Sequence, residues 1–480
     1  MLKALKLSSG PLSSILVTYL LYQETGDYQM ARMGGIAVWM ATWWILESVS
    51  LYLTALLPLV LFPFTGIMSM QETAPLYTHE IIFLFLGGFL LAFSVERWNL
   101  HRRMAWAILK FTGESALGVL TGVMLTAWFL SMWMSNIATL LMLIPAVKGL
   151  GETGLKDADD TRNWKFNTAL LLGLAYACSL GGIATLVGTA PNMIFLAFYE
   201  KHFPESNPVT FLSWMKTALP ISALMLMTCI GILNAMFLKP GLQLSKTGLL
   251  EFEVFKDSKP MSRDEKWVGG IFVATILLWC FREDIDLGGV YIPGWSRLLP
   301  WPEMIKDSTV AMLMAFVLLM LPDQKGSTLL TWKEVQSIPL GILFLFGGGF
   351  ALAEGIQSTG LSDWLGSHLH NLKVFSPFMI IVLLSVFMTF FTELTSNTAA
   401  TYIILPIVLS LVQSLNMPPL QLLLPVVLSA SMAFMLPIAT PPNTVIFATE
   451  KIRMRDMIVA GLWMNLAGVI IISGLVWLIH

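Results

Sequence analysis

The residues of this chain that could do chemistry occur twice. Ser135-Asn136-Ile137-Ala138 returns as Ser396-Asn397-Thr398-Ala399. A Pro-Asn element follows each copy, Gly188-Thr189-Ala190-Pro191-Asn192 first and Ala439-Thr440-Pro441-Pro442-Asn443 second. Ser, Thr and Asn supply short, neutral hydrogen-bonding groups that can hold ions without placing a fixed charge in an apolar setting. A duplicated polar turn of this kind predicts a site for a transported ligand.

The setting of these motifs is strongly apolar. Hydrophobic residues make up 56% of the 480 positions, and charged residues only 12%. Many apolar runs separated by short polar segments are typical of a polytopic membrane protein embedded in a lipid bilayer. The net charge of −2 argues against a nucleic-acid partner. The three cysteines, at unrelated spacings, predict neither a disulfide framework nor a metal knuckle.

Apolar runs predict about eleven membrane crossings in an all-α fold. They lie near residues 11–22, 33–49, 50–66, 81–97, 168–198, 212–237, 267–281, 308–322, 338–357, 419–449 and 457–479. The range 33–66 has a second interpretation, as one bent helix with Glu47 and Ser48 at its break.

The two Ser-Asn motifs lie at the midpoints of two further apolar ranges, 114–147 and 375–413. Each range is long enough for two arms of about 15 residues. We predict a re-entrant hairpin in each range. Non-helical backbone at membrane depth is tolerated only where it is buried in protein or lines a watery cavity, so each tip should face a binding site.

The chain also repeats on a larger scale. A shift of 261 residues aligns Gly87-Gly88-Phe89 with Gly348-Gly349-Phe350, and Ser135-Asn136 with Ser396-Asn397. The Pro-Asn elements align at 251 instead, because the loop after the first hairpin is longer. Each half has five crossings and a hairpin. Equivalent elements therefore enter from opposite faces, which predicts an inverted repeat.

This repeat predicts the organisation of the chain. We expect an N-terminal helix and loop over 1–32, a first repeat over 33–238, a cytoplasmic connector over 239–266 and a second repeat over 267–480. The first repeat contains a helix over 168–198 that we expect to break at residues 188–192, and the second contains one over 419–449 that we expect to break at residues 439–443.

Basic residues predict the orientation, because cytoplasmic loops carry an excess of Lys and Arg. With the N-terminus in the cytoplasm, 21 of the 28 Lys and Arg residues fall on the cytoplasmic side. The C-terminus is then external. We expect a multi-pass protein of the plasma membrane, the inner membrane in a bacterium.

The hairpin tips and the broken helices should meet near the membrane midplane. Half-helix N-termini present unsatisfied N–H groups and a partial positive charge, which suit a carboxylate or sulfate, whereas unwound carbonyls suit Na⁺. The architecture therefore favours binding of an anion together with a cation.

At these residues the chain resembles the divalent anion/sodium symporter family, solute carrier family 13. The resemblance covers nearly the whole chain and is most specific over residues 181–192 and 430–446. It implies a C4 dicarboxylate such as succinate as the substrate and Na⁺ as the coupling ion, with no other cofactor. It also implies a homodimer that works by an elevator mechanism.

The resemblance further implies roles for individual residues. One Na⁺ site would use Ser131, Ser135, Asn136 and the Gly188 carbonyl. The other would use Thr392, Thr395, Asn397 and the Ala439 carbonyl. The substrate carboxylates would be bound by Asn136, Thr189, Asn397, Thr398, Thr440 and the turn at Pro441.

One residue departs from the family pattern. Ile137 stands where the family uses a hydroxyl beside the substrate. Loss of one hydrogen bond to a buried carboxylate costs about 1–3 kcal/mol. This loss could shift the preference toward a smaller anion, or Thr139 or Thr189 could cover it. A dicarboxylate is the first choice, and sulfate-like anions are the second.

Other functions fit the sequence less well. No apolar span carries a nucleophile-base pair or a metal-binding motif of an enzyme. A passive anion channel could use the same donors, but helices broken at a closed midplane site suit alternating access better. H⁺ symport and anion exchange remain alternatives to Na⁺ symport. Glu354 and Glu393 are intramembrane acids that could carry protons, pair with a basic residue or serve as structural acids.

Overall fold

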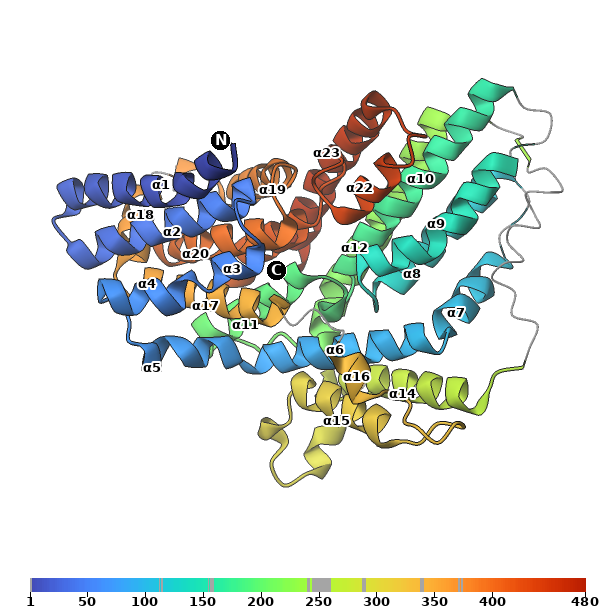
Figure 1. The fold of residues 1–480 in the computed structure, drawn as a ribbon, viewed down its shortest axis with the longest axis horizontal. Helices are drawn as coiled ribbons and strands as arrows, with labels where there is room; N and C mark the ends of the chain where they lie inside the picture. The colour runs from blue at the N-terminus through green and yellow to red at the C-terminus, as the bar shows by residue number, and fades with distance from the viewer. Residues whose placement is uncertain are drawn as a thin grey trace.

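The computed structural model describes residues 2–111, 113, 115–153, 155, 159–239, 242–243, 260–286, 291–336, 341–369, 372 and 374–480. Its long elements are all helices (Figure 1), as the sequence predicted. Within this part of the chain, five helical segments are long and apolar enough to cross a membrane. They are Met70–Arg97, Asp160–Ile183, Phe211–Phe237, Asn397–Leu415 and Met454–Ile479. Six shorter apolar helices accompany them.

The N-terminal helices form a packed group. Helix α1 (Leu2–Thr25) lies along α2 (Tyr28–Leu46), and the chain then folds back through α3 (Leu51–Ala55) and α4 (Leu57–Thr65), which both contact α2. The turn falls at residues 47–50, so the range 33–66 contains two segments and not one bent helix.

Each half next contains a long apolar helix followed by a short one. In the first half these are α6 (Glu80–Arg97) and α7 (Leu100–Leu109), preceded by α5 (Met70–Thr73) and η1 (Ala74–Thr78). In the second half they are α17 (Gly341–Ser358) and α18 (Leu361–Leu369), preceded by α16 (Trp332–Val335). The apolar runs did not predict α7 and α18, because both helices are short and carry polar residues.

The two Ser-Asn ranges fold as helix-turn-helix hairpins. Helix α8 (Ala116–Ser131) and α9 (Asn136–Thr153) enclose a turn at 132–135, and α19 (Pro377–Thr392) and α20 (Asn397–Leu415) enclose a turn at 393–396. The motif asparagine is the first residue of the second arm in both hairpins. Figure 1 shows α8 and α9 lying side by side.

The broken helices are interrupted earlier than the sequence predicted. Helix α10 (Asp160–Ile183) leads through η2 (Leu186–Gly188) to α11 (Ala190–His202), and α21 (Pro419–Ala430) leads through residues 431–440 to α22 (Pro441–Phe447). The Pro residues of both motifs therefore start the second helical segment and do not lie in the gap. Proline is tolerated in a first helical turn because its missing N–H has no intrahelical partner there.

The remaining helices connect the halves. Helix α12 (Phe211–Phe237) closes the first half and α23 (Met454–Ile479) the second, and these two pack together. Helix α14 (Arg263–Cys280) leads to α15 (Asp307–Met320), which packs along α6, whereas α3 packs along α17. The long helix of each half, α6 or α17, therefore packs against a helix of the other half.

The connection from α14 to α15 carries the only non-helical regular structure among the described residues. It holds the antiparallel strands β1 (Ile285–Asp286) and β2 (Tyr291–Ile292), followed by η4 (Trp295–Leu298) and η5 (Pro302–Met304). These two-residue strands were not expected from the sequence. Most of the predicted connector 239–266 lies outside the described residues.

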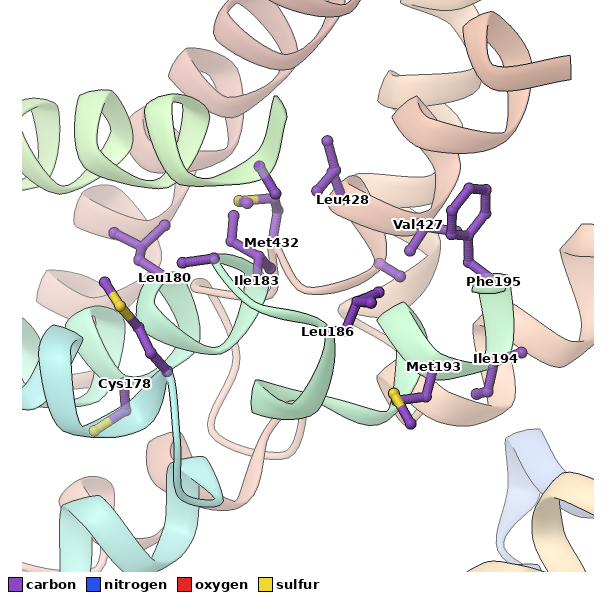
Figure 2. Close-up of a cluster of buried hydrophobic side chains, with 14 of the residues drawn as sticks. Cys178, Leu180, Ile183, Leu186, Met193, Ile194, Phe195, Val427, Leu428 and Met432 are labelled. Atoms are coloured by element: carbon purple, nitrogen blue, oxygen red, sulfur yellow. The ribbon is translucent and has the colours of Figure 1, made fainter. Parts of the chain in front are cut away.

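The first helix break packs on one side against an apolar core. Figure 2 shows Leu186 in the break and Met193 beyond it, with Val427 and Leu428 of α21 nearby. All four side chains are fully buried. This close packing holds the backbone of the break in one position.

Candidate binding site

One cavity brings both hairpin tips and both helix breaks together. It has a volume of about 720 Å³. The first half contributes residues 133–137 and 187–190, and the second contributes 396–398 and 438–442. Apolar side chains of α6, including Phe85 and Phe89, complete the wall. Segments that are hundreds of residues apart in the chain therefore share one site.

Most of the predicted ligands line this cavity, and the rest lie behind the tips. The lining residues are Ser135, Asn136, Gly188, Thr189, Asn397, Thr398, Ala439, Thr440 and Pro441. Ser131, Thr392 and Thr395 are buried and do not line it. All three were predicted only as Na⁺ ligands, whereas every residue predicted to bind the substrate lines the cavity. The other residues predicted only as Na⁺ ligands, Ser135, Gly188 and Ala439, also border the cavity. This arrangement suits a substrate in the cavity and cations bound partly behind each tip.

The same hydrogen bond spans both tips. The Ser131 hydroxyl donates to Asn136 Oδ1 at 2.7 Å, and the Thr392 hydroxyl lies 2.9 Å from Asn397 Oδ1. The Thr392 hydroxyl also lies 2.7 Å from the carbonyl oxygen of Ala430, where the second break begins. Two residues of each predicted Na⁺ site are therefore in direct contact.

Gly182, near the end of α10, lies where the first helix break and the first hairpin tip are in contact. A Cβ atom added at Gly182 would lie 2.7 Å from Asn136 Oδ1 and 3.3 Å from the Gly188 carbonyl oxygen. Both oxygens are predicted Na⁺ ligands, and both lie around this one point. Only glycine leaves the space open.

The asparagine of each Pro-Asn element ties its own helix break. Asn192 Nδ2 donates to the carbonyl oxygens of Gly182 at 3.0 Å and Thr185 at 2.7 Å. Asn443 Nδ2 donates to those of Ala433 at 3.0 Å and Leu436 at 3.1 Å. The donor and both acceptors of the first break correspond to those of the second at the offset of 251 residues. Sequence reasoning noted these asparagines but gave them no role, although the shared offset was a signal that both serve the same purpose.

The tips are also tied to the breaks, by different chemistry in the two halves. In the first half, the Thr185 hydroxyl donates to the Met132 carbonyl. In the second half, the Glu393 carboxylate accepts from the backbone N–H groups of Phe434, Met435 and Leu436 at 2.7–3.1 Å. Asn465 Nδ2 donates to the same carboxylate at 2.8 Å.

These contacts decide among the interpretations of the two intramembrane acids. Glu393 is buried, and its hydrogen-bond partners among the described residues are neutral N–H donors. These four donors tie the second tip to the second break and to α23, which supports a structural role for the carboxyl group. Glu354 of α17 instead forms an ion pair with Lys201 at the end of α11, as expected for an acid with a basic partner. Neither arrangement requires a proton carrier.

The cavity offers donors without a fixed positive charge. Helices α9, α11, α20 and α22 begin at residues that line it, so the positive ends of four helix dipoles lie near the same space. Pro441 and Pro442, the first residues of α22, carry no N–H, so that helix contributes its dipole and not its first donors. Within the described part of the chain, no Lys, Arg or His lines the cavity. An anion bound here would be met by dipoles and neutral side chains, and its charge would need a mobile cation.

Comparison with known proteins supports a transport function. The sequence pattern described as the sodium:sulfate symporter transmembrane region matches residues 11–479. A Staphylococcus saprophyticus protein named sodium-dependent dicarboxylate transporter SdcS is 35% identical over 491 aligned positions, covering 96% of this chain and 88% of that protein. A protein of the same name from Staphylococcus aureus is also 35% identical, with 98% and 90% coverage.

Two solved structures share the fold. The YdaH transporter of Alcanivorax borkumensis superimposes with a TM-score of 0.58 at 12% identity, over 87% of this chain and 88% of that one. MtrF of Neisseria gonorrhoeae gives 0.59 at 13% identity, over 85% and 83%. The family match over residues 11–479 and the identity to the staphylococcal proteins confirm the resemblance seen in the motifs. They place the chain among multi-pass membrane transporters and not among enzymes. The chain belongs to the sodium:sulfate symporter family.

Proposed function

We propose that this protein imports a divalent anion, a C4 dicarboxylate such as succinate, together with Na⁺. The observation that carries the proposal is the single cavity lined by both tips and both breaks. Its volume of about 720 Å³ lies within the range of small-molecule sites. The names of the staphylococcal relatives support the same substrate class and the same coupling ion.

Charge balance supports Na⁺ coupling. A dianion in a membrane-embedded cavity without Lys, Arg or His in its described wall has no fixed counter-charge. Burial of unpaired charge is costly, so cations should accompany the substrate. Ser131, Ser135, Asn136 and Gly188 would hold one Na⁺, and Thr392, Thr395, Asn397 and Ala439 would hold the second.

The substrate would lie between the two tips. Its carboxylates would be bound by Asn136, Thr189, Asn397, Thr398, Thr440 and the turn at Pro441. Ile137 and Thr398 occupy equivalent positions, and both line the cavity. The second half therefore offers a hydroxyl where the first half offers only hydrocarbon. A sulfate-type anion is the second candidate, because the lost hydroxyl at Ile137 could shift the preference toward a smaller anion.

Further parts of the proposal concern movement and assembly. The hairpins and broken helices would move as one body against a scaffold that contains α6 and α17, in an elevator mechanism. The protein would act as a homodimer in the bacterial inner membrane, with its N-terminus in the cytoplasm and its C-terminus outside. Native mass spectrometry tests the dimer, and labelling of cysteines introduced near each terminus tests the orientation.

A binding experiment tests the substrate class. The thermal unfolding temperature of the purified protein would be measured with succinate, citrate or sulfate, in Na⁺ and in K⁺. Succinate should raise this temperature in Na⁺ and not in K⁺, because ligands stabilise the state that binds them. Stabilisation by sulfate alone would select the second candidate, and equal stabilisation in Na⁺ and K⁺ would argue for exchange without Na⁺ coupling.

A further inference from the structure

Glu47 places a negative charge in the wall of the anion cavity. It lies at the end of α2, outside both tips and both breaks, and it lines the cavity together with Leu51. It is the one titratable side chain among the described lining residues. Lys6 Nζ donates to the Leu46 carbonyl at 3.1 Å, at the same end of α2, but Lys6 does not line the cavity.

The backbone at Glu47 shows that the fold does not require a side chain there. Glu47 is in the left-handed region, with φ 46° and ψ 46°, and its N–H caps the Trp43 carbonyl. Glycine adopts this conformation without the steric cost that other residues bear. The side chain is exposed, so no packing compensates for that cost. A role of the carboxylate in the cavity would explain its presence.

We propose that Glu47 weakens substrate binding, by repelling the dianion bound at the tips. The inference rests on the proposed transport of a dianion. A compact cavity of this volume is about 11 Å across, so the carboxylate lies on the order of 10 Å from the substrate. Repulsion between one and two negative charges at that distance in water lowers affinity about fourfold, and for a monoanion about twofold.

An electrostatic repulsion depends on the salt concentration, whereas a steric effect does not. The screening length is about 30 Å at 0.01 M salt and about 10 Å at 0.1 M. The repulsion should therefore be visible in dilute salt and nearly absent at about 0.5 M. It should also scale with the charge of the ligand, and contacts made by the side chain itself would not follow this pattern.

Calorimetric titration of the purified full-length protein tests the proposal. Succinate and its monomethyl ester would be titrated in 10 mM NaCl, with and without 0.5 M choline chloride. Glu47→Gln keeps the side-chain shape and removes the charge. Glu450→Gln is the matched control, because Glu450 is also exposed, also has a positive φ of 60°, and does not line the cavity.

Glu47→Gln should bind succinate about two to four times more tightly in dilute salt, with a smaller gain for the monoester and almost none in choline chloride. Glu450→Gln should bind like the wild type. Glu47→Gly, which relieves the backbone strain, should show the same gain and serves if Glu47→Gln does not fold. If the affinity of Glu47→Gln does not rise, or rises equally at all salt concentrations and ligand charges, the role proposed for Glu47 is wrong. The proposed transport function would not be affected by that result. Failure of the wild type to bind any dianion overturns the proposed function itself.

Discussion

The Ser131 hydroxyl donates to Asn136 Oδ1 at 2.7 Å across the first hairpin tip. Because Oδ1 accepts this hydrogen bond, the Nδ2 group of Asn136 is left as the donor for a substrate oxygen. Thr392 and Asn397 repeat the arrangement at 2.9 Å. Each asparagine thus stands between a buried hydroxyl and the cavity, a position suited to linking cation binding with anion binding.

Removal of one such asparagine should weaken both ligands. Asn397→Ala should raise the half-saturating concentrations of succinate and of Na⁺ together, each about tenfold, because hydrogen bonds to charged groups contribute about 1.5–3 kcal/mol. Uptake into proteoliposomes at varied Na⁺ measures both values. The control is Asn207→Ala, at an exposed position in the loop after α11. Lost succinate binding with an unchanged Na⁺ dependence would contradict the shared site.

Restoring the missing hydroxyl should improve dicarboxylate affinity. Ile137→Thr adds a donor on the side of the cavity where Thr398 has no counterpart, and the succinate KM should fall by up to about tenfold. Ile137→Val is the control, because it shortens the side chain without adding a hydroxyl. If Ile137→Thr leaves KM unchanged or raises it, this site does not use the hydroxyl.

Filling the space at Gly182 should damage the proposed first Na⁺ site. In Gly182→Ala the new methyl group would lie 2.7 Å from Asn136 Oδ1, closer than ordinary contact allows. We expect the half-saturating Na⁺ concentration to rise about tenfold or more. Gly173→Ala in the same helix is the control, since its methyl group would meet side-chain atoms of Leu120 and Met124 away from the tip. Equal Na⁺ responses in the two variants would show that Gly182 does not border a cation site.

The asparagines of the helix breaks should stabilise the two halves to a similar extent. Asn192→Ala and Asn443→Ala each leave two buried carbonyl groups without their amide donor. We expect each variant to lose about 1–3 kcal/mol of unfolding free energy. Thermal unfolding of the purified variants measures the loss. A large loss in one variant and none in the other would mean that the two breaks are not equivalent.

The ion pair between Lys201 and Glu354 offers a test of movement. It joins α11 of a broken helix to α17 of the proposed scaffold. In a background without Cys178, Cys229 and Cys280, a reducible thiol-specific cross-linker between Lys201→Cys and Glu354→Cys should stop uptake and leave Na⁺-dependent succinate binding intact. A linker is needed because the contact joins the ends of two long side chains, farther apart at the backbone than a disulfide spans. Reduction of the cross-link should restore uptake. Full transport after complete cross-linking would argue against the elevator mechanism.

The sequence alone predicted the parts of the fold that depend on local pattern. The Ser-Asn motifs identified both hairpins, because polar residues inside long apolar ranges must form the turns. The exact breaks were less predictable: α11 starts at Ala190 and α22 at Pro441, so the prolines lie inside first turns and not in the gaps. Proline is compatible with either position, so contacts made in three dimensions decide between them, such as the packing around Leu186 at the first break and the hydrogen bonds of Asn443 at the second.

Other features depend on contacts between distant segments. The position of Glu47 on the cavity wall arises because α2 and α3 pack against α17 of the other half. The role of Glu393 could not be read from its neighbours in sequence, since three of its donors come from residues 434–436. The equal offsets of Asn192 and Asn443, in contrast, were visible in the sequence and indicated a shared role.

Uptake of radiolabelled succinate into proteoliposomes tests the central claim most directly. Inward gradients of Na⁺ or K⁺ would be imposed, with unlabelled succinate, citrate or sulfate as competitors. The two tips, the cation ligands proposed at them and a cavity whose described wall has no basic residue predict accumulation above equilibrium in Na⁺ only, and competition by unlabelled succinate. Gradient-independent exchange, or uptake of sulfate without succinate, would contradict Na⁺-coupled dicarboxylate import.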